Sequence, residues 1–435
     1  MRCLARFLGA LSIICSGLCN AAVIDAQPDN YVQKLPLLVA GDTLRLAPGV
    51  YRAGLKLHHL SGSAGQPIVI EGRSNLPAIF LGRPAANTVS IVDSRFIVLR
   101  NLVFNGLNAG GEAVKAEGYA HFAHDITLEN LRIINHGGRQ AIVAISTHCP
   151  AWNWIIRGNR IIRPGTGLYL GNSDGTAPFV AGLIEHNAII NPIGYGMQIK
   201  HQLIRPELAG MPTGISSTII RDNLFVKAKN FSTGKEARPN LLVGHFPPSG
   251  AGRDDRYEVY RNVFLHNPSE ALFQGEGNIA LYNNLFVNVA GNAIHIQPHN
   301  DVPKQIDIFH NTVIASGKGI LLRNGFFGPT HKQKIVANLV FAAEPVSGGE
   351  QAHNIVGGRE LAGRYLRAPF GTFAQLRLDP IAGRLPLPDV DLGWMQAFTD
   401  ADRDIDGRLL GLGYIGAYAK EAVRPLPFSG TRQIR

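Results

Sequence analysis

The chain has 435 residues, of which 45% are hydrophobic and 17% are charged, and its formal net charge at pH 7 is +10. Three of the four cysteines, Cys3, Cys15 and Cys19, fall within the first 22 residues, which excludes a disulfide framework for the rest of the chain. The remaining cysteine, Cys149, has no activating neighbour in the sequence, so we expect a buried packing thiol rather than a nucleophile.

Residues 1–22 have the features of a secretory signal peptide. Arg2 and Arg6 precede an apolar stretch at 7–18, and small residues follow at 20–22. No other apolar run is long enough to cross a bilayer, so no membrane span is expected and the predicted localisation is secreted or periplasmic. Removal of this segment takes two arginines from the 42 Lys and Arg, leaving 40 against 32 Asp and Glu, a net charge of +8.

A basic exported protein suits a polyanionic partner. Nucleic acid is disfavoured, because the sequence has no basic run with interleaved aromatic residues and the chain is expected to leave the cytoplasm. An acidic polysaccharide, bound by a monomer, is therefore the predicted partner.

The segment 23–50 is expected to cap one end of a solenoid, because an uncovered end would expose unpaired strand edges. Its pattern predicts a short amphipathic helix within 29–38 and a strand at 43–46. Early coils follow at 67–72 and 89–99.

A short phrase, Asn followed by a branched or aromatic apolar triplet, recurs nine times at steps of 22 to 39 residues. The nine residues are Asn101, Asn130, Asn159, Asn187, Asn223, Asn262, Asn284, Asn311 and Asn338. Each triplet is followed by a polar turn and a second β-rich run such as GLYL or GILLR. This pattern predicts an all-β, right-handed parallel β-helix of about 10–12 coils over 51–346. The asparagines are expected to stack at one internal bend.

After residue 346 the periodicity fades, and 347–435 is expected to form C-terminal coils and an irregular tail. This tail contains an acidic cluster, Asp400, Asp402, Asp404 and Asp406. The cluster lacks the glycine at the sixth position and the acidic twelfth ligand of a calcium loop, so we interpret it as a solvated turn.

The two longest steps of the repeat contain insertions, at 201–217 and 227–256. Both leave at or near the end of the second strand of a coil, so they are predicted to overhang the same face. They carry Arg205, Arg238, Arg253 and Arg256, which are candidate substrate-binding residues in the wall of a cleft.

Aligning the second strand of successive coils gives a column whose inner positions are mostly aliphatic. The aligned rows begin at Ile142, Leu168, Met197, Leu241, Leu272, Ile294 and Ile320. From the fourth position onward the column contains polar residues: Lys200, His201, His245, Glu276, Gln297, His299 and Arg323. Singly, each reads as a solvated charge or a packed residue. Together they predict a site, with Lys200 and His245 as catalytic residues and the others as substrate-binding residues.

Stacked coils lie about 4.8 Å apart, so Lys200, His245 and Glu276 would span about 10 Å, the length of two sugar residues. Cleaving a uronate chain by β-elimination requires a base for the C5 proton and a partner for the C6 carboxylate. A lysine among other cations has a lowered pKa and can act as the base. Hydrolysis would require two carboxylates across the scissile bond, and Glu276 stands alone in the column.

The segments LVAGDTLRLAPGVYRAGLKLHHLSGSAGQPIVIEG and VSIVDSRFIVLRNLVFNG resemble the N-terminal coils of the chondroitinase B and alginate lyase family, within the pectate-lyase-like superfamily. The resemblance implies a β-helix lyase in which a lysine at the end of a coil strand is the base, and Lys200 matches that position. His245 stands where the family has an arginine. The resemblance raises calcium as a cofactor, but Met197-Gln198 occupies the stretch of the family's calcium-binding glutamates, so the calcium ligands are not matched.

A second resemblance leaves the reaction open. The run Gln297-Pro298-His299-Asn300-Asp301 is similar to the Asp-Pro-His-Asp signature of alginate C5-epimerases, with Gln in place of the first Asp. Epimerases abstract the same proton but return one to the opposite face. The sequence therefore predicts a lyase, with a C5-epimerase, a β-helix glycoside hydrolase and a non-catalytic glycan-binding module as alternatives.

Overall fold

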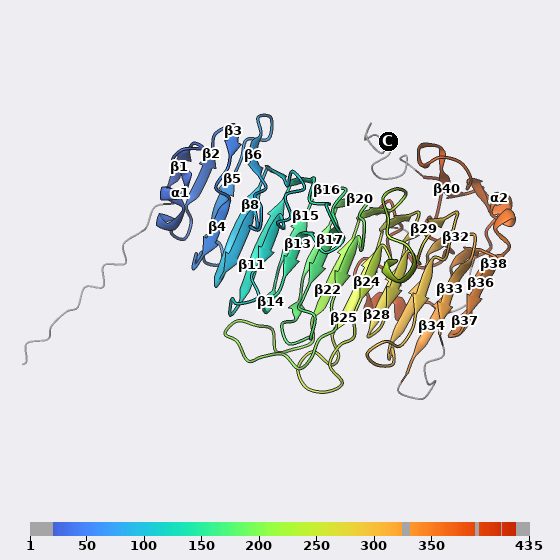
Figure 1. Ribbon diagram of the computed structural model, residues 1–435. Coiled ribbons are helices and arrows are strands. Elements are labelled where there is room, and N and C mark those ends of the chain that lie inside the picture. Colours follow the sequence, from blue (N-terminus) through green and yellow to red (C-terminus); the bar gives the residue numbers. More distant parts are fainter. Residues whose placement is uncertain (1–20, 324–330, 388–390, 410, 423–435) are drawn as a thin grey trace, which may run out of the picture.

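The computed structural model describes residues 21–323, 331–387, 391–409 and 411–422. Within them the chain winds into a parallel β-helix in which each coil contributes one strand to each of three sheets, here called sheets A, B and C (Figure 1). The predicted fold class is confirmed. The sequence repeat revealed two strands per coil, in sheets B and C; the third strand lies just before each Asn and belongs to sheet A.

Sheet A contains, in spatial order, β1 (Val23–Ala26), β2 (Thr43–Leu46), β5 (Ile68–Glu71), β8 (Ser94–Arg100), β11 (Ala123–Glu129), β15 (Ile155–Arg157), β19 (Leu183–Glu185), β22 (Ser217–Arg221), β25 (Arg256–Tyr260), β28 (Ile279–Tyr282), β31 (Ile306–Phe309), β34 (Gln333–Val336) and β37 (Glu350–Ala352), with β14 (Ala151–Trp152) and β18 (Phe179–Val180) at one margin. Sheet B contains β3 (Gly49–Tyr51), β6 (Ala78–Leu81), β9 (Leu102–Asn105), β12 (Arg132–Ile134), β16 (Arg160–Ile162), β20 (Ala188–Ile190), β23 (Leu224–Val226), β26 (Val263–Leu265), β29 (Leu285–Asn288), β32 (Thr312–Ala315), β35 (Leu339–Phe341) and β38 (Ile355–Gly357). Sheet C contains β4 (Leu55–His58), β7 (Val89–Val92), β10 (Val114–Ala116), β13 (Val143–Thr147), β17 (Thr166–Leu170), β21 (Met197–Ile199), β24 (Leu241–Val243), β27 (Phe273–Gly275), β30 (Ile294–Ile296), β33 (Lys318–Leu322) and β36 (Glu344–Ser347).

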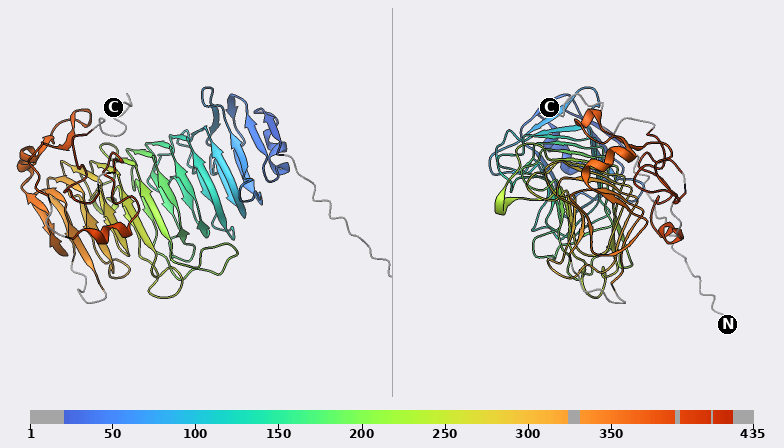
Figure 2. Two further views of the ribbon diagram at one scale, coloured as in Figure 1. Left: turned by 180° about the vertical axis from the view of Figure 1, so that it is seen from behind. Right: turned by 90° about the vertical axis from the view of Figure 1, so that its right-hand side faces the viewer.

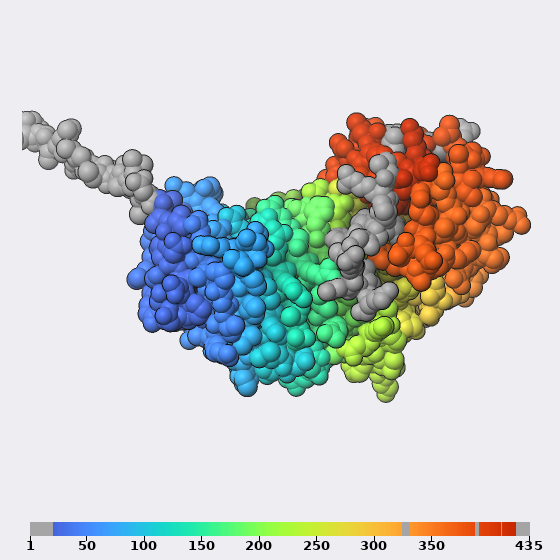
Figure 3. Space-filling model, turned by 90° about the horizontal axis from the view of Figure 1, so that it is seen from above, coloured from blue at the N-terminus to red at the C-terminus, as the bar shows by residue number. Residues whose placement is uncertain are grey.

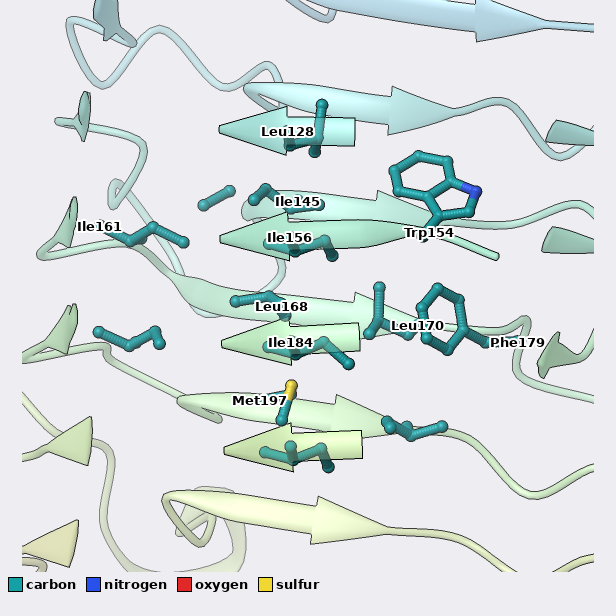
Figure 4. Packing of buried hydrophobic residues seen from close by; sticks show 14 of the residues in the cluster. Leu128, Ile145, Trp154, Ile156, Ile161, Leu168, Leu170, Phe179, Ile184 and Met197 are labelled. Carbon is teal, nitrogen blue, oxygen red and sulfur yellow. The ribbon is translucent and has the colours of Figure 1, made fainter. Parts of the chain in front are cut away.

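The core is a column of aliphatic and aromatic side chains enclosed by the three sheets. Figure 4 shows Leu128, Ile156 and Ile184 of sheet A in one row, and each of the three is fully buried. Strand alternation explains the pattern, because every second residue of each short strand points inward. The same alternation directs the intervening residues to the outer faces. Cys149 is buried and free, as predicted, and burial raises its pKa to about 12.

An asparagine ladder runs along the bend between sheets A and B. From Asn159 onward, each Nδ2 donates a hydrogen bond of 2.9–3.0 Å to the Oδ1 of the asparagine in the next coil. The prediction that all nine asparagines stack was wrong for Asn101 and Asn130. These two residues lie one position before the ladder position of their coils, at the bend itself, and adopt positive φ. The following leucines occupy their ladder positions, and the Leu131 amide donates to Asn159 Oδ1. At the other end the ladder continues one coil further, to Asn354.

The two ends of the solenoid differ: the N-terminal end is covered, whereas Val356, the inward-facing residue of the last sheet B strand, is 49% exposed. At the N-terminal end, α1 (Tyr31–Lys34) and η1 (Leu35–Leu37) follow β1, and Tyr31 packs edge-on against Tyr51 with ring centroids 5.1 Å apart. At the other end, β36, β37 and β38 complete a coil. They are followed by η3 (Arg359–Leu361) and α2 (Ala362–Tyr365), from which Tyr365 stacks on Phe341.

The C-terminal segment then folds back over the coils. It contains β39 (Leu366–Ala368), η4 (Phe373–Gln375), β40 (Arg377–Pro380) and η5 (Gly393–Ala397). Its apolar residues, among them Leu366 and Met395, bury the outer faces of sheets A and B. Figure 2 shows the segment from behind, and Figure 3 shows it in orange and red over the C-terminal half of the molecule. The outer face of sheet C carries no such cover within the described residues.

The acidic cluster in this segment is a structural clamp rather than the expected solvated turn. Asp400 forms ion pairs with Arg221 (3.3 Å) and Arg261 (3.2 Å), which project from the coils. Asp404 is fully buried and accepts hydrogen bonds from the backbone amides of Asp406 and Arg408. Asp400 therefore fixes the segment to the coils, and Asp404 stabilises the turn within the segment.

The insertions leave the solenoid at two corners, contrary to the prediction that they overhang one face. The loops 200–216 and 244–255 join sheet C to sheet A and hang below the strands in Figure 1. The segment 227–240 joins sheet B to sheet C, contains η2 (Gly234–Glu236), and approaches sheet C from the opposite end of its strands. Strand β24 separates the two parts of the predicted insertion at 227–256.

Of the predicted signal peptide, residues 1–20 lie outside the described residues. Within the described residues, no helix is long and apolar enough to span a membrane.

Candidate functional site

The carboxyl ends of four neighbouring sheet C strands bring the predicted polar residues together. Ile199 of β21 pairs with Val243 of β24, Val243 with Gly275 of β27, and Gly275 with Ile296 of β30. The residues that follow these positions therefore occupy one row across the coils.

That row contains Lys200, Gly244, Glu276 and Gln297, in successive coils. Two rows of the sequence alignment were wrong in register, since Phe273 and Ile145, not Leu272 and Ile142, take the first position. With this correction Glu276 moves into the row of Lys200.

A cavity of about 420 Å³ opens over this row, and we call it the Lys200 cavity. Its lining consists of Ser173, Tyr195, Gln198, Lys200, His201, Ala237, Arg238, Pro239, Leu242, Val243, Gly244, Gln274, Gly275, Glu276, Gln297, His299 and Asn300. Six of the eleven predicted site residues are thus brought together, from three strand ends and the segment 227–240. The cavity lies on the sheet that the C-terminal segment leaves uncovered.

Lys200 is half-buried on the floor of this cavity. Burial lowers the pKa of its ammonium below the ordinary 10.5, and the carboxylate of Glu276 opposes this effect. The sequence reasoning attributed a lowered pKa to neighbouring cations; the structure instead gives burial as the main cause. The Nζ lies 5.8 Å from the centre of the Tyr169 ring. The adjacent His201 also has a lowered pKa, first because of burial and second because of Lys200.

Glu276 is buried and organises the far end of the cavity. Its Oε2 accepts hydrogen bonds from the backbone amides of His299 (3.0 Å), Asn300 (2.7 Å) and Asp301 (3.4 Å). The turn that carries His299 is therefore held against the strand end by a carboxylate. With its oxygens engaged in this way, Glu276 is a poor proton donor or nucleophile.

The residues around Lys200 do not fit a calcium site. Met197 points into the core and is fully buried, while Gln198 offers a neutral amide where carboxylates would be needed. Among the described residues, no three His, Cys, Asp or Glu side chains are grouped so that they could hold a metal ion.

Arg238 forms the wall of the cavity opposite the turn. Its guanidinium lies 5.7 Å from the centre of the Tyr195 ring and donates to the carbonyls of Lys235 and Ala237. Beneath it, the fully buried Lys227 donates a 2.6 Å hydrogen bond to the Arg238 carbonyl oxygen. Burial lowers the pKa of Lys227 to about 7. A buried lysine thus anchors the segment that carries Arg238.

Within the described part of the chain, five predicted residues do not line the Lys200 cavity: His245, Arg205, Arg253, Arg256 and Arg323. His245 follows Gly244 in the next coil, but its imidazole is buried, with Nε2 3.6 Å from Asp301 Oδ2. Its catalytic role stays a prediction.

The four arginines have other surroundings. Arg205 is buried in an ion pair with Asp255, and its Nη1 donates to the Pro212 carbonyl. Arg256 begins β25 on sheet A, where it lies 5.0 Å from the Phe398 ring centre. Arg253 is exposed beside Asp254, and Arg323 is exposed at the end of β33.

Several residues around Lys200 escaped the sequence reasoning. Gln198 lines the cavity and lies two residues before Lys200 on the same outward face of β21. Tyr169 pairs with Gln198 from β17, just outside the cavity lining. Strand alternation gave a signal for both, because the second position of each row points outward just as the fourth does. Tyr195 and Asn300 lie in turns, for which the repeat pattern gave no register.

No family model and no curated protein sequence matches the chain. Solved structures are similar to it. One is an alginate lyase from Paenibacillus sp. str. FPU-7, with 15% identity and a TM-score of 0.50 over 78% of this chain and 98% of that one. Another is the GH136 lacto-N-biosidase from Eubacterium ramulus, with 12% identity and a TM-score of 0.52 over 77% of this chain and 68% of that one. At these identities the likeness shows the fold, a parallel β-helix resembling those of carbohydrate-active enzymes.

Proposed function

We propose that the protein is a polysaccharide lyase that cleaves an acidic, uronate-containing polysaccharide by β-elimination. The observation that carries this proposal is Lys200, a half-buried lysine with a lowered pKa on the floor of a cavity, with the guanidinium of Arg238 in its wall. A lowered pKa makes the neutral amine of Lys200 easier to form than that of a solvated lysine, and the neutral amine can act as a base.

In the proposed reaction the neutral amine of Lys200 removes the C5 proton of the uronate. The electron pair released at C5 forms the C4–C5 double bond, and the C4–oxygen bond breaks. The departing oxygen takes its proton from the newly formed Lys200 ammonium. Arg238 and the amide of Gln198 are placed to bind the C6 carboxylate and to stabilise the negative charge that develops there.

A uronate C5-epimerase is the second candidate, since Gln297, His299 and Asn300 of the epimerase-like run line the same cavity. An epimerase would use Lys200 in the same way but would reprotonate C5 from the other face. Hydrolysis is disfavoured: of the described residues that line the cavity, Glu276 is the single carboxylate, and retaining and inverting hydrolases both require two.

A panel of uronate polymers tests the reaction class. Incubation with purified protein should produce near-ultraviolet absorbance from the unsaturated uronate, in step with a fall in polymer length. Inverted stereochemistry at C5 without new absorbance would indicate the epimerase instead. New reducing ends without absorbance would indicate a hydrolase, and binding without any change in the polymer would indicate a glycan-binding module.

We also propose that the chain is exported, because an extracellular polymer does not enter the cytoplasm. The support is the segment 1–22 and the net charge of +8 without it. Fractionation of expressing cells, with N-terminal sequencing of the exported form, should find a chain that begins near residue 23. A chain that remains in the cytoplasm with Met1 intact would contradict the proposal.

A further inference from the structure

A second cavity, of about 340 Å³, adjoins the Lys200 cavity on the outer face of sheet C. It shares Tyr195, Gln198, Lys200 and Arg238 with the Lys200 cavity and extends toward the N-terminal coils. The residues that belong to it alone are Glu112, Gln140, Ala141, Val143, His148, Thr166 and Tyr169. We call it the His148 cavity.

Two buried polar atoms in the His148 cavity have no hydrogen-bond partner. They are Oε1 of Gln140, which can only accept, and Nε2 of His148. Leaving such atoms unpaired is costly, typically about 1–3 kcal/mol each. Both belong to residues that line the same hollow, so a ligand with hydroxyl groups would satisfy both.

The charges around the His148 cavity differ from those around Lys200. Two carboxylates, Glu112 and Glu117, lie near enough to His148 to affect its pKa, which burial lowers. Glu112 accepts from Lys115 Nζ at 3.2 Å and from the Ser146 hydroxyl, and Glu117 accepts from Asn87 Nδ2 at 2.9 Å. Lys200 and Arg238 line the side of this cavity that is shared with the Lys200 cavity. At the other end, around His148, one lysine faces two glutamates, and that end disfavours a further carboxylate.

The spacing between the cavities corresponds to about two sugar residues. Leu170 of β17 pairs with Thr147 of β13 on one side and with Ile199 of β21 on the other. The residues that follow, His148 and Lys200, are thus two coils apart, about 10 Å. Tyr169 lies between them: its ring stacks on the His148 ring with centroids 5.4 Å apart, and Lys200 Nζ lies over the Tyr169 ring, 5.8 Å from its centre.

We propose that the His148 cavity is a subsite for an uncharged sugar unit of the polysaccharide, one or two residues from the uronate that reacts at Lys200. This inference rests on the proposed function and narrows its substrate class. The substrate is a heteropolymer in which uronates are interspersed with neutral hexoses. Gln140 Oε1 accepts a sugar hydroxyl, His148 Nε2 bonds a second, and Glu112 and Glu117 select against a uronate at this position.

Calorimetric titration of the full-length protein with two tetrasaccharides tests the subsite. One probe alternates a pair of uronates with a pair of neutral hexoses, so that a neutral hexose lies two residues from each uronate, and the other consists of uronates only. The alternating probe should bind at least tenfold more tightly. In Gln140→Ala and in His148→Phe, which retains a flat ring against Tyr169, its Kd should rise about tenfold, whereas the Kd of the all-uronate probe should change less than twofold. Lys56→Ala is the control, since Lys56 is an exposed lysine at the N-terminal end of the same sheet.

The outcomes separate the two proposals. Preferential binding of the alternating probe without any unsaturated product would support the subsite and overturn the lyase. Turnover of both polymers, with equal affinity for the two probes and no effect of Gln140→Ala or His148→Phe, would overturn the subsite and leave the lyase standing. Should His148→Phe unfold, Gln140→Ala alone decides, because its side chain is only partly buried and its loss leaves the strands intact.

Discussion

Burial without a compensating ion pair determines what Lys200 can do. The described residues provide no hydrogen-bond partner for its ammonium, and the carboxylate that affects it, Glu276, is engaged by the turn at 299–301. An amine in this environment loses its proton more readily than a solvated lysine. The base role therefore rests on the cavity that partly encloses Lys200.

Lys200→Ala is expected to reduce kcat by about 10² to 10⁴, the usual contribution of a positioned base. Lys200→Arg should be nearly as damaging, because a guanidinium does not lose its proton near neutral pH. Initial rates on the best uronate polymer measure both, with Lys56→Ala as the matched control that retains full activity. An active Lys200→Arg would assign Lys200 to carboxylate binding and transfer the base to another residue, such as His299.

The rate of the wild-type protein should rise with pH. The reaction needs the neutral amine, whose fraction grows as the pH approaches the lowered pKa of Lys200 from below. The midpoint of kcat/KM against pH should fall below 10.5. A kcat/KM that does not change with pH below 10.5 would contradict the assignment of Lys200 as the base.

Asparagines at the bend between sheets A and B have two different structural roles, which substitutions should distinguish. Asn262 donates to Asn284, Ile220 and Tyr260 and accepts two bonds from Asn223. Asn262→Ala would leave several buried polar groups without a hydrogen-bond partner and should lower the free energy of unfolding by about 3 kcal/mol or more. Asn130, exposed at positive φ, should tolerate Gly at almost no cost. Urea unfolding midpoints compare the two; equal losses would contradict the distinction.

The sequence predicted individual residues where strand alternation applied. It identified Lys200 and most inward aliphatic positions, because a period of two needs only the strand, whereas Glu276 joined the row of Lys200 only once the register of its strand was known. It could not place His245 in or out of the cavity, since one residue past the strand end the chain turns and alternation no longer applies. The asparagine ladder shows the same limit: NLRII at Asn130 and NRII at Asn159 differ by one residue, and only the pairing of Arg132 with Arg160 reveals the shift.

At the scale of elements, the C-terminal segment is coupled to the coils through a buried histidine. His310, at the bend before β32, is fully buried and stacks on Tyr414 of that segment with ring centroids 4.1 Å apart. Burial lowers its pKa from 6.5 to about 3. The unfolded chain takes up a proton near pH 6.5, whereas the folded chain does not until about pH 3. Stability is therefore full above about pH 6.5 and should fall by about 1.4 kcal/mol per unit below it.

Replacing His310 should flatten this acid dependence. In His310→Asn the side chain no longer titrates and the positive φ is still tolerated. The slope of the unfolding free energy against pH, between pH 6 and pH 4, should therefore decrease by about 1.4 kcal/mol per pH unit, the contribution of one proton. His353→Asn is the control, because His353 occupies the same bend in the last coil with positive φ but is exposed. Equal slopes in all three proteins would show that His310 does not drive acid unfolding.

Element order was more predictable than element placement. The two prominent strands of each coil and the strand at Thr43–Leu46 follow from the sequence, since repetition reinforces each weak local signal. The insertions and the C-terminal segment occur once, and nothing in their local sequence shows which corner they leave from or which face they cover. The clamp at Asp400 depends on arginines 139 and 179 residues away along the chain.

For the whole molecule, the arrangement of covers defines one working face. The C-terminal segment occupies the outer sides of sheets A and B, so the face of sheet C, with both cavities, is left for a long ligand. α1 covers the N-terminal end, and the strands of the last coil carry exposed carboxylates, Glu344 and Glu350, which disfavour pairing with another chain. Together with the net charge of +8 that remains without residues 1–22, this arrangement favours a monomer.

Sedimentation equilibrium at micromolar concentration should therefore give the mass of one chain, at most 47.0 kDa. The value should be the same at low and high salt, because the cover at the N-terminal end, unlike charge repulsion, is not screened. A mass of two chains at either salt concentration would contradict the monomer.

The asparagine ladder also affects how such a molecule can change in length over evolutionary time. In each coil from Asn159 to Asn338 the asparagine amide donates a hydrogen bond to the asparagine of the next coil, so every junction in that stretch is chemically equivalent. A duplication or deletion of one whole coil would leave its neighbours with the same partner as before. The early coils, with leucines at this position, lack that interchangeability. Relatives of this chain should accordingly differ by whole coils within the asparagine stretch and by loop lengths elsewhere.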